Sequence, residues 1–142
     1  MSKIAVFPGT FDPFHSGHLE VVTQARAIFD EVIILFADNP RKLRLFNQQE
    51  EMDRVQSLFD CQVTVDYTDG LVSDYCDKYE VSFIVRGLRS ASDFDYEIAL
   101  ARINEDLNPY VRTIFLPTNS FVSSSFIREL YKHGKDYEKY LI

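Results

Sequence analysis

Five short apolar runs, each about as long as one β-strand, set the pattern of this 142-residue chain. They are rich in β-branched and aromatic residues and are bounded by turn residues, which is typical of strands. The run at 32–36, with the sequence VIILF, has no polar interruption, as expected for a strand that is covered on both faces. We expect strands at 3–8, 31–37, 62–67, 81–86 and 111–117.

Segments with helical spacing lie between these runs. Leu19, Val22 and Ala25 recur on one helix face, and Asn47 followed by Glu50 resembles a capping box that opens a second helix. We expect helices near 19–29, 47–58, 71–79, 93–107 and 123–131. Strands and helices that alternate with short connections predict an α/β fold, namely a Rossmann-like, doubly wound, five-stranded parallel sheet with helices on both faces.

Composition narrows the class of protein further. The length suits one domain over residues 1–142. Cys61 and Cys76 are the two cysteines and neither has metal-ligand spacing, which excludes a disulfide scaffold or a zinc module; we expect two inert, buried thiols. No apolar run approaches the ~20 residues of a membrane span, and the N-terminus does not resemble a signal peptide. We therefore expect a soluble, cytoplasmic protein with no membrane partner.

The charge balance bears on the ligand. The chain carries 15 Lys and Arg against 22 Asp and Glu, a net charge of −7. General nucleic-acid binding depends on a basic face, so we expect no nucleic-acid partner. A small anionic ligand needs only a local positive pocket, and the charge balance does not exclude one.

The first strand is followed by residues suited to an anion. In a doubly wound sheet the ligand lies beyond the carboxyl ends of the strands. Here Gly9 allows close approach of the backbone, and the N–H groups of Thr10 and Phe11 are placed to face a phosphate. The segment is neither a dinucleotide fingerprint nor a P-loop. His15 and His18 could bind a metal, but only Asp12 is nearby as a third ligand, so we disfavour a protein-held metal.

Three other expected strand ends carry similar chemistry. The loop at 39–46 holds three cations in four residues, and we favour anion binding over a solvated surface. Arg86 ends a buried run, so it is either salt-bridged or phosphate-facing. Serines at 123–125 serve as helix caps or as phosphate ligands. Because these signals fall at one edge of the sheet, we expect a nucleotide or another polyphosphate as ligand.

Four segments resemble the HxGH nucleotidyltransferase superfamily. They are PGTFDPFHSGH at 8–18, NPRK at 39–42, FIVRGLRSASDFDYE at 83–97 and SFVSSSFIREL at 120–130. Within that superfamily the chain is most similar to the bacterial phosphopantetheine adenylyltransferases, and the RGLR…DFxYE combination is the more specific part. Arg44 stands where a proline is common in that family, and His15 where many members carry threonine.

The resemblance implies a reaction and its partners. AMP would pass reversibly from ATP to 4′-phosphopantetheine, which gives dephospho-CoA and pyrophosphate in coenzyme A biosynthesis. Mg²⁺ would accompany ATP, and the assembly would be a homohexamer.

The resemblance also implies residue roles. His18 would stabilise the transition state, Lys42 and Arg86 would hold the acceptor phosphate, and Val72 would line the pantetheine arm. Thr10 would touch both substrates. The residues implied to bind ATP are Thr10, Phe11, His18, Gly87, Leu88, Arg89, Glu97, Asn119, Ser120, Phe121, Val122, Ser123, Ser124 and Ser125. By its position alone Glu97 is an exposed helical acid; the resemblance instead gives it a role beside the ribose or adenine.

The implied chemistry needs no general base. A phosphate monoester has a second pKa near ~6, so the acceptor is already ionised at neutral pH. Catalysis would then depend on positioning and electrostatics, with His18 donating to the α-phosphate and His15 as a candidate assistant. Two alternatives stay open: transfer to another acceptor such as nicotinamide mononucleotide, and a non-catalytic nucleotide sensor.

Overall fold

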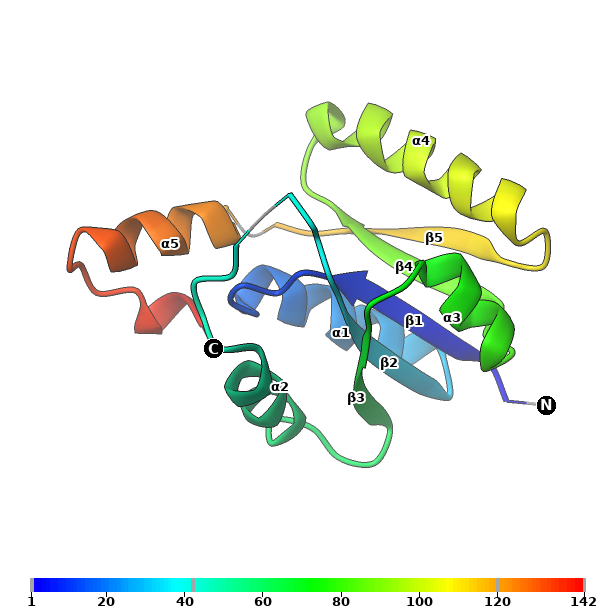
Figure 1. Ribbon diagram of the computed structural model, residues 1–142, viewed down its shortest axis with the longest axis horizontal. Coiled ribbons are helices and arrows are strands. Elements are labelled where there is room, and N and C mark those ends of the chain that lie inside the picture. Colours follow the sequence, from blue (N-terminus) through cyan, green and yellow to red (C-terminus); the bar gives the residue numbers. More distant parts are fainter. Residues whose placement is uncertain (1, 42, 120, 142) are drawn as a thin grey trace.

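Strands and helices alternate along the computed structural model, which describes residues 2–41, 43–119 and 121–141 (Figure 1). The strands are β1 Ile4–Gly9, β2 Glu31–Ala37, β3 Val63–Thr68, β4 Phe83–Leu88 and β5 Arg112–Pro117. The helices are α1 Ser16–Ile28, α2 Gln48–Gln56, α3 Val72–Lys78, α4 Ala91–Leu107 and α5 Ser124–Lys132, followed by a 3₁₀ turn at Glu138–Tyr140. No helix in these ranges is both long and apolar enough to cross a membrane.

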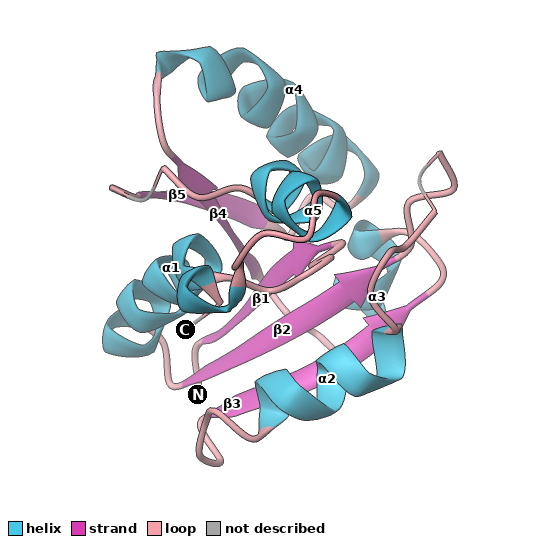
Figure 2. Ribbon diagram, turned by 90° about the vertical axis from the view of Figure 1, so that its left-hand side faces the viewer, coloured by secondary structure: helices cyan, strands magenta, loops and turns pink. Residues whose placement is uncertain are grey.

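The strands form one parallel sheet in the order β3-β2-β1-β4-β5. This confirms the predicted Rossmann-like, doubly wound fold. Helices α1 and α2 cover one face of the sheet, and α3 and α4 cover the other (Figure 2). Helix α5 lies beyond the sheet rather than on either face (Figure 1).

Strand β2 shows how the sequence builds this core. Val32, Ile34 and Phe36 join the apolar cluster under α1 and α2, whereas Ile33 and Leu35 join the cluster under α3. Successive side chains of a strand point to opposite faces, so an unbroken apolar run fills both layers at once. The predicted two-sided burial of the VIILF run is confirmed.

The sheet parts where its strand order reverses. β1 and β2 pair from Ile4↔Glu31 to Gly9↔Phe36, and β4 and β5 pair from Phe83↔Arg112 to Leu88↔Pro117. Between β1 and β4, by contrast, the register holds only Ala5↔Phe83 and Val6↔Ile84. Beyond this last pair the two strands separate toward their carboxyl ends. Such a switch point is where ligands bind in open α/β sheets.

Two expectations from the sequence are wrong in detail. Strand β4 begins at Phe83, two residues later than predicted, because Val81 is buried as a core contact ahead of the strand rather than within it. Cys61 is exposed, since it lies in the turn before β3, whereas Cys76 is buried as expected. Burial raises the pKa of the Cys76 thiol to about 11.

Candidate active site

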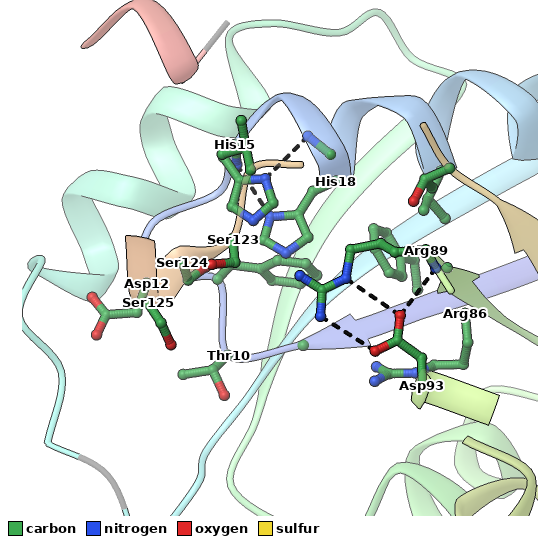
Figure 3. A pocket seen from close by; sticks show the side chains of 18 of the residues that line it. Thr10, Asp12, His15, His18, Arg86, Arg89, Asp93, Ser123, Ser124 and Ser125 are labelled. Atoms are coloured by element: carbon green, nitrogen blue, oxygen red, sulfur yellow. Dashed lines mark hydrogen bonds and ion pairs between the residues drawn. The ribbon is translucent and has the colours of Figure 1, made fainter. Parts of the chain in front are cut away.

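A pocket of about 580 Å³ opens where β1 and β4 separate (Figure 3). Its walls come from the β1–α1 loop, the end of β4, the first turns of α4 and the start of α5. The residues predicted to bind substrate that line it are Thr10, Phe11, His18, Arg86, Gly87, Arg89, Glu97, Val122, Ser123, Ser124 and Ser125. The fold thus gathers segments from four places in the sequence at one edge.

Some predicted residues lie elsewhere. Val72 packs against the core under α3, and Phe121 is 76% exposed against the rings of Phe126 and Tyr140. Leu88 and Asn119 are also absent from the pocket lining. The predictions for Lys42 and Ser120 lie outside the described residues.

Other lining residues were not among the predicted ligands. Leu43, Asp93 and Arg128 are examples. Each lies within or next to a segment that carries the family resemblance, so proximity in sequence was the signal that could have found them. Asp12 and His15, considered as metal ligands, line the pocket too.

The β1–α1 loop holds an unusual backbone conformation. Phe11 has a φ of 49°, in the left-handed region that non-glycine residues seldom adopt. Such a conformation costs about 1–3 kcal/mol and persists only where the surroundings hold it. The buried Phe11 ring packs against the rings of Phe7, Phe14 and Phe36 at 5.0–5.5 Å between centroids. A Cβ on Gly9 would lie 2.8 Å from the same ring, so Gly9 is required for this packing.

Side chains from distant elements hold the carbonyl groups of this loop. Arg86 donates to the carbonyl of Pro8 and Arg54 to that of Phe14, both at 2.7 Å. The remaining contacts are Arg44 to the carbonyls of Thr10 and Phe11, Arg128 to that of Asp12, and Ser124 to that of Pro13. The Asp12 carbonyl precedes Pro13 and shares its peptide unit with no N–H group. In the other units the C=O and N–H point in opposite directions, so those contacts also orient N–H groups of the loop.

Asp12 ties the loop to the segment after β2. Its buried carboxylate accepts from the backbone N–H of Leu45 at 2.9 Å and of Phe46 at 2.8 Å. Charged acceptors make the stronger class of hydrogen bond, so Asp12 acts here as a structural anchor. No group of three His, Cys, Asp or Glu side chains in the described ranges is placed to hold a metal ion.

The two histidines cap α1 and stack on each other. Nδ1 of His15 accepts from the N–H of Gly17 at 3.0 Å, and Nδ1 of His18 accepts from the N–H of His15 at 3.1 Å. The ring centroids are 3.7 Å apart. Because each Nδ1 is an acceptor, each neutral ring carries its proton on Nε2. Both Nε2–H groups are therefore available as donors.

The surroundings keep both rings neutral at pH 7. Burial, with contributions from His15, Arg86 and Arg89, lowers the pKa of His18 well below 6.5. Burial and then Arg89 lower the pKa of His15 to about 4. Phe7, Phe11 and Phe14 surround the His18 ring, with centroids 4.9–6.1 Å away. His18 is thus a neutral, pre-positioned hydrogen-bond donor.

Arg86 is fixed by a buried carboxylate. Its Nε and Nη2 atoms each donate to Glu97 at 2.8 Å. Glu97 is 7% exposed, so the expectation of an exposed helical acid is wrong. The reason is that α4 turns this residue toward β4, where Arg86 neutralises it. The salt-bridged alternative for Arg86 is confirmed, and Arg86 also lines the pocket.

Arg89 is held more loosely. Its guanidinium lies 3.3 Å from the carboxylate of Asp93, and its side chain is 49% exposed (Figure 3). Hydrogen bonding from Arg89 lowers the pKa of Asp93. An exposed pair of this kind contributes at most about 1 kcal/mol, so Arg89 can exchange its partner at little cost.

The serine segment opens α5 at the pocket. Ser123 caps the helix by accepting from the N–H of Phe126 at 3.1 Å, which confirms the capping interpretation. Ser125 accepts from Arg128 at 3.1 Å. The first-turn N–H groups of a helix and its dipole favour an anion. The pocket therefore meets a helix N-terminus at one wall and arginines at another.

The family match and the curated relatives identify the chain as a nucleotidyltransferase. The chain belongs to the cytidylyltransferase-like family, which it matches over residues 6–130. The enzyme class predicted from the sequence is confirmed by this match and by the relatives that follow.

Curated relatives cover most of the chain. A protein of Leptospira biflexa serovar Patoc (strain Patoc 1 / Ames) named phosphopantetheine adenylyltransferase is 40% identical over 140 residues, or 95% of this chain and 88% of that protein. A protein of the same name from Dictyoglomus turgidum is 42% identical over 135 residues, or 92% of this chain and 84% of that protein. The predicted resemblance is confirmed.

Solved structures support the fold. A bifunctional NMN adenylyltransferase/ADP ribose pyrophosphatase from Francisella tularensis, complexed with AMP and a manganese ion, matches 99% of this chain with a TM-score of 0.73 and 19% identity. This chain spans 44% of that protein. A lipopolysaccharide core biosynthesis protein from Thermoplasma volcanium matches 86% of this chain with a TM-score of 0.62 and 16% identity. At these identities the likeness concerns the fold alone.

Proposed function

We propose that this protein transfers the AMP unit of Mg²⁺-bound ATP to 4′-phosphopantetheine, giving dephospho-CoA and pyrophosphate. The observation that carries the reaction class is one pocket in which neutral histidine donors, arginines and a helix N-terminus converge. The acceptor follows from relatives of that name at 40–42% identity.

The nucleotide would occupy the wall formed by α5 and the end of β4. We assign the triphosphate to the N-terminus of α5 and to Arg89, whose weak pair with Asp93 leaves it free to reorient. The ribose and adenine would lie toward Glu97 and Gly87. A Cβ on Gly87 would lie 2.8 Å from Val21, so the glycine permits the close approach of β4 to α1.

The acceptor phosphate attacks the α-phosphorus of ATP in line. A new P–O bond forms, the bond between the α-phosphorus and the bridging oxygen breaks, and pyrophosphate leaves with that electron pair. Nε2–H of His18 donates to a non-bridging oxygen as charge develops there, and Arg86 and Lys42 offset the repulsion between the two anions. One preorganised donor of this kind contributes about 10²–10³ in rate.

Mg²⁺ enters this scheme as part of the nucleotide. Mg²⁺ retains several waters and binds readily through substrate phosphates with few protein ligands. The carboxylates nearest the site already have partners, since Asp12 accepts backbone N–H groups and Glu97 binds Arg86. We therefore write the metal as part of the substrate.

Three further proposals rest on the family resemblance: a cytoplasmic location, a homohexamer, and contact of Val72 with the pantetheine arm. Light scattering of the purified protein tests the hexamer. A single-subunit mass would contradict it.

A panel of acceptors tests the proposed function. Purified protein is incubated with ATP and Mg²⁺ and with 4′-phosphopantetheine, nicotinamide mononucleotide or no acceptor, and pyrophosphate is measured. We expect release with 4′-phosphopantetheine and a loss of about 10²–10³ in kcat for His18→Ala, with the circular dichroism spectrum unchanged. Release with the mononucleotide instead, or ATP binding without any release, would contradict the proposal.

A further inference from the structure

Arg44 binds the β1–α1 loop from outside the pocket. It lies between β2 and α2 and does not line the pocket. Its two Nη atoms donate to the carbonyls of Thr10 and Phe11, the latter at 2.9 Å. Its Nε donates to the carbonyl of Phe46 at 3.2 Å, and the guanidinium lies 5.7 Å from the centroid of the Phe36 ring. One planar fork thus engages three carbonyl groups.

The two carbonyls in this fork flank the left-handed residue. Phe11, with a φ of 49°, lies between the peptide units that Arg44 holds on either side. Fixing the carbonyls of Thr10 and Phe11 directs the N–H groups of Phe11 and Asp12 away from Arg44. Thr10, Phe11 and Asp12 all line the pocket, whereas Arg44 does not. The fork therefore sets the orientation of the N–H groups that a phosphate would meet.

The same segment is joined to the loop a second time. The N–H groups of Leu45 and Phe46 donate to the carboxylate of Asp12. Hydrogen bonds therefore join residues 44–46 and 10–12 in both directions, because a side chain of each segment binds the backbone of the other. We call this set of hydrogen bonds the clamp. Leu43, immediately before this clamp, lines the pocket. The clamp therefore couples the loop after β2 to the loop after β1.

Arg44 has no carboxylate within ion-pair distance in the part of the chain that the structure describes. Its contacts are to neutral oxygen atoms and to an aromatic face. The Arg44 guanidinium thus stabilises the conformation of the backbone. Its planar group with several N–H donors can bind three carbonyls at once, which a lysine ammonium cannot do in the same geometry.

We propose that Arg44 is a positioning residue for nucleotidyl transfer, which holds the Thr10 and Phe11 peptides in their phosphate-binding orientation. The inference rests on the proposed function. The resemblance places a proline at this position in many family members, and a proline side chain could not make these contacts.

Three variants test the role. Arg44→Met keeps the stem and removes the fork, and Arg44→Lys keeps the charge but not the planar fork. Arg26→Met is the matched control. Arg26 is also half-buried, bonds Gln62 at 3.0 Å and Asp60 at 3.1 Å, and lies 5.8 Å from the Phe59 ring, but it does not line the pocket.

The readouts are kcat, KM for each substrate and Tm, with activity measured well below the lowest Tm. We expect Arg44→Met to lower kcat by about 10–100-fold, because misplacing substrate-binding groups by about 1 Å costs up to 10²-fold. Arg44→Lys should recover less than half of that loss on a logarithmic scale. Arg26→Met should keep kcat within about twofold while losing a similar few degrees of Tm.

Wild-type kcat in Arg44→Met, or full activity in Arg44→Lys, would overturn the inference, the latter because charge alone would suffice. A loss of kcat in Arg26→Met equal to that in Arg44→Met would overturn it as well, since general destabilisation would explain both. Absence of turnover in the wild-type protein with 4′-phosphopantetheine would instead contradict the proposed function.

Discussion

The ends of β1 and β4 use arginine in opposite ways. After β1, Arg44 and Arg128 donate to backbone carbonyls of residues 10–12. At the end of β4, Arg86 and Arg89 pair with carboxylates of α4. A carbonyl is neutral, so the first pair of arginines keeps its full charge near the pocket, whereas the second pair is largely compensated. In a chain of net charge −7, the described pocket lining thus balances Arg86, Arg89 and Arg128 against Asp12, Asp93 and Glu97, and Arg44 adds a positive charge just outside it.

The β4 end is itself graded. The side chains of Arg86 and Glu97 are 22% and 8% exposed, whereas those of Arg89 and Asp93 are 49% and 23% exposed. Screening by water weakens the second pair, and burial makes the first pair costly to break. Arg86 is thus a fixed part of the wall, and Arg89 is the arginine that can follow a ligand.

The largest expected effect on stability comes from removing the carboxylate that pairs with Arg86 at the end of β4. Glu97→Ala leaves the partly buried Arg86 without its partner and should lower the free energy of unfolding by about 3–5 kcal/mol. Urea denaturation at pH 7 measures this loss. Glu129→Ala, which removes an acid paired with His133 at the surface, is the control and should stay within about 0.5 kcal/mol of wild type. A loss of unfolding free energy below about 1 kcal/mol in Glu97→Ala would show that the Arg86–Glu97 pair does not hold the pocket wall in place.

The next prediction concerns the histidines between the two ends. His15 has a pKa of about 4 in the folded protein against about 6.5 unfolded. The unfolded state therefore binds more protons between these values, so stability falls as the pH drops from about 6.5 toward 4. At pH 4.5 the depressed pKa of His15 should lower the free energy of unfolding by about 2–3 kcal/mol relative to pH 7.

His15→Ser tests the contribution of the His15 ring to this pH dependence. Serine can cap the helix but does not titrate. The decrease in unfolding free energy from pH 7 to pH 4.5 should be about 2–3 kcal/mol smaller in this variant than in wild type. Equal decreases in the two proteins would contradict a depressed pKa of His15 as a source of acid sensitivity.

A third prediction concerns the loop after β1, which hydrogen bonds to its backbone and to Asp12 hold in place. Asp12→Ala removes the acceptor of the Leu45 and Phe46 N–H groups and should cost about 2 kcal/mol in stability, the usual range for hydrogen bonds to charged groups. Because it loosens the clamp that carries Arg44, it should also raise KM for ATP. Urea denaturation and initial rates measure both effects. An unchanged KM would separate the Asp12 anchor from the site.

The smallest expected effect concerns the exposed pair. Asp93→Asn should change stability by less than about 1 kcal/mol, because the pair with Arg89 is solvent-screened. If Arg89 moves onto the nucleotide, releasing it should leave KM for ATP equal or lower. A destabilisation comparable to that of Glu97→Ala would remove the distinction between the two pairs.

Local patterns predicted much of the fold. The VIILF run fixed β2, whose bounds match the prediction, because apolar residues without interruption need cover on both faces. The last helix was expected near 123–131 and ends at Lys132, and Gly134 just beyond it has a φ of 66°, the left-handed value that glycine adopts after a helix. In both cases the determining interactions lie within a few residues of sequence.

The site was less accessible to such patterns, because its key contacts join residues far apart. Glu97 resembles a surface acid until β4 brings Arg86 beneath it. Arg44 belongs to a loop for which anion binding was favoured, yet its guanidinium donates to two carbonyls of the β1–α1 loop, a contact that no local pattern indicates. The family resemblance identified which segments matter. It did not indicate that Val72 lies outside the pocket lining, which depends on how α3 packs on the sheet.

Because the pairing between β1 and β4 ends after Val6↔Ile84, the two strands contribute to the core along one part and to the pocket along another. Below Val6 and Ile84 the strands are bonded edge to edge and bury the apolar layers that stabilise the protein. Toward their carboxyl ends the two strands separate from each other, although β1 stays paired with β2 and β4 with β5. Phe7 and Val85 in this part still belong to the core, whereas Arg86 and Gly87 line the pocket. The scaffold should therefore tolerate exchange of exposed pocket residues such as Arg89, whereas exchange of Arg86 or Glu97 would alter the pocket and the stability of the domain together.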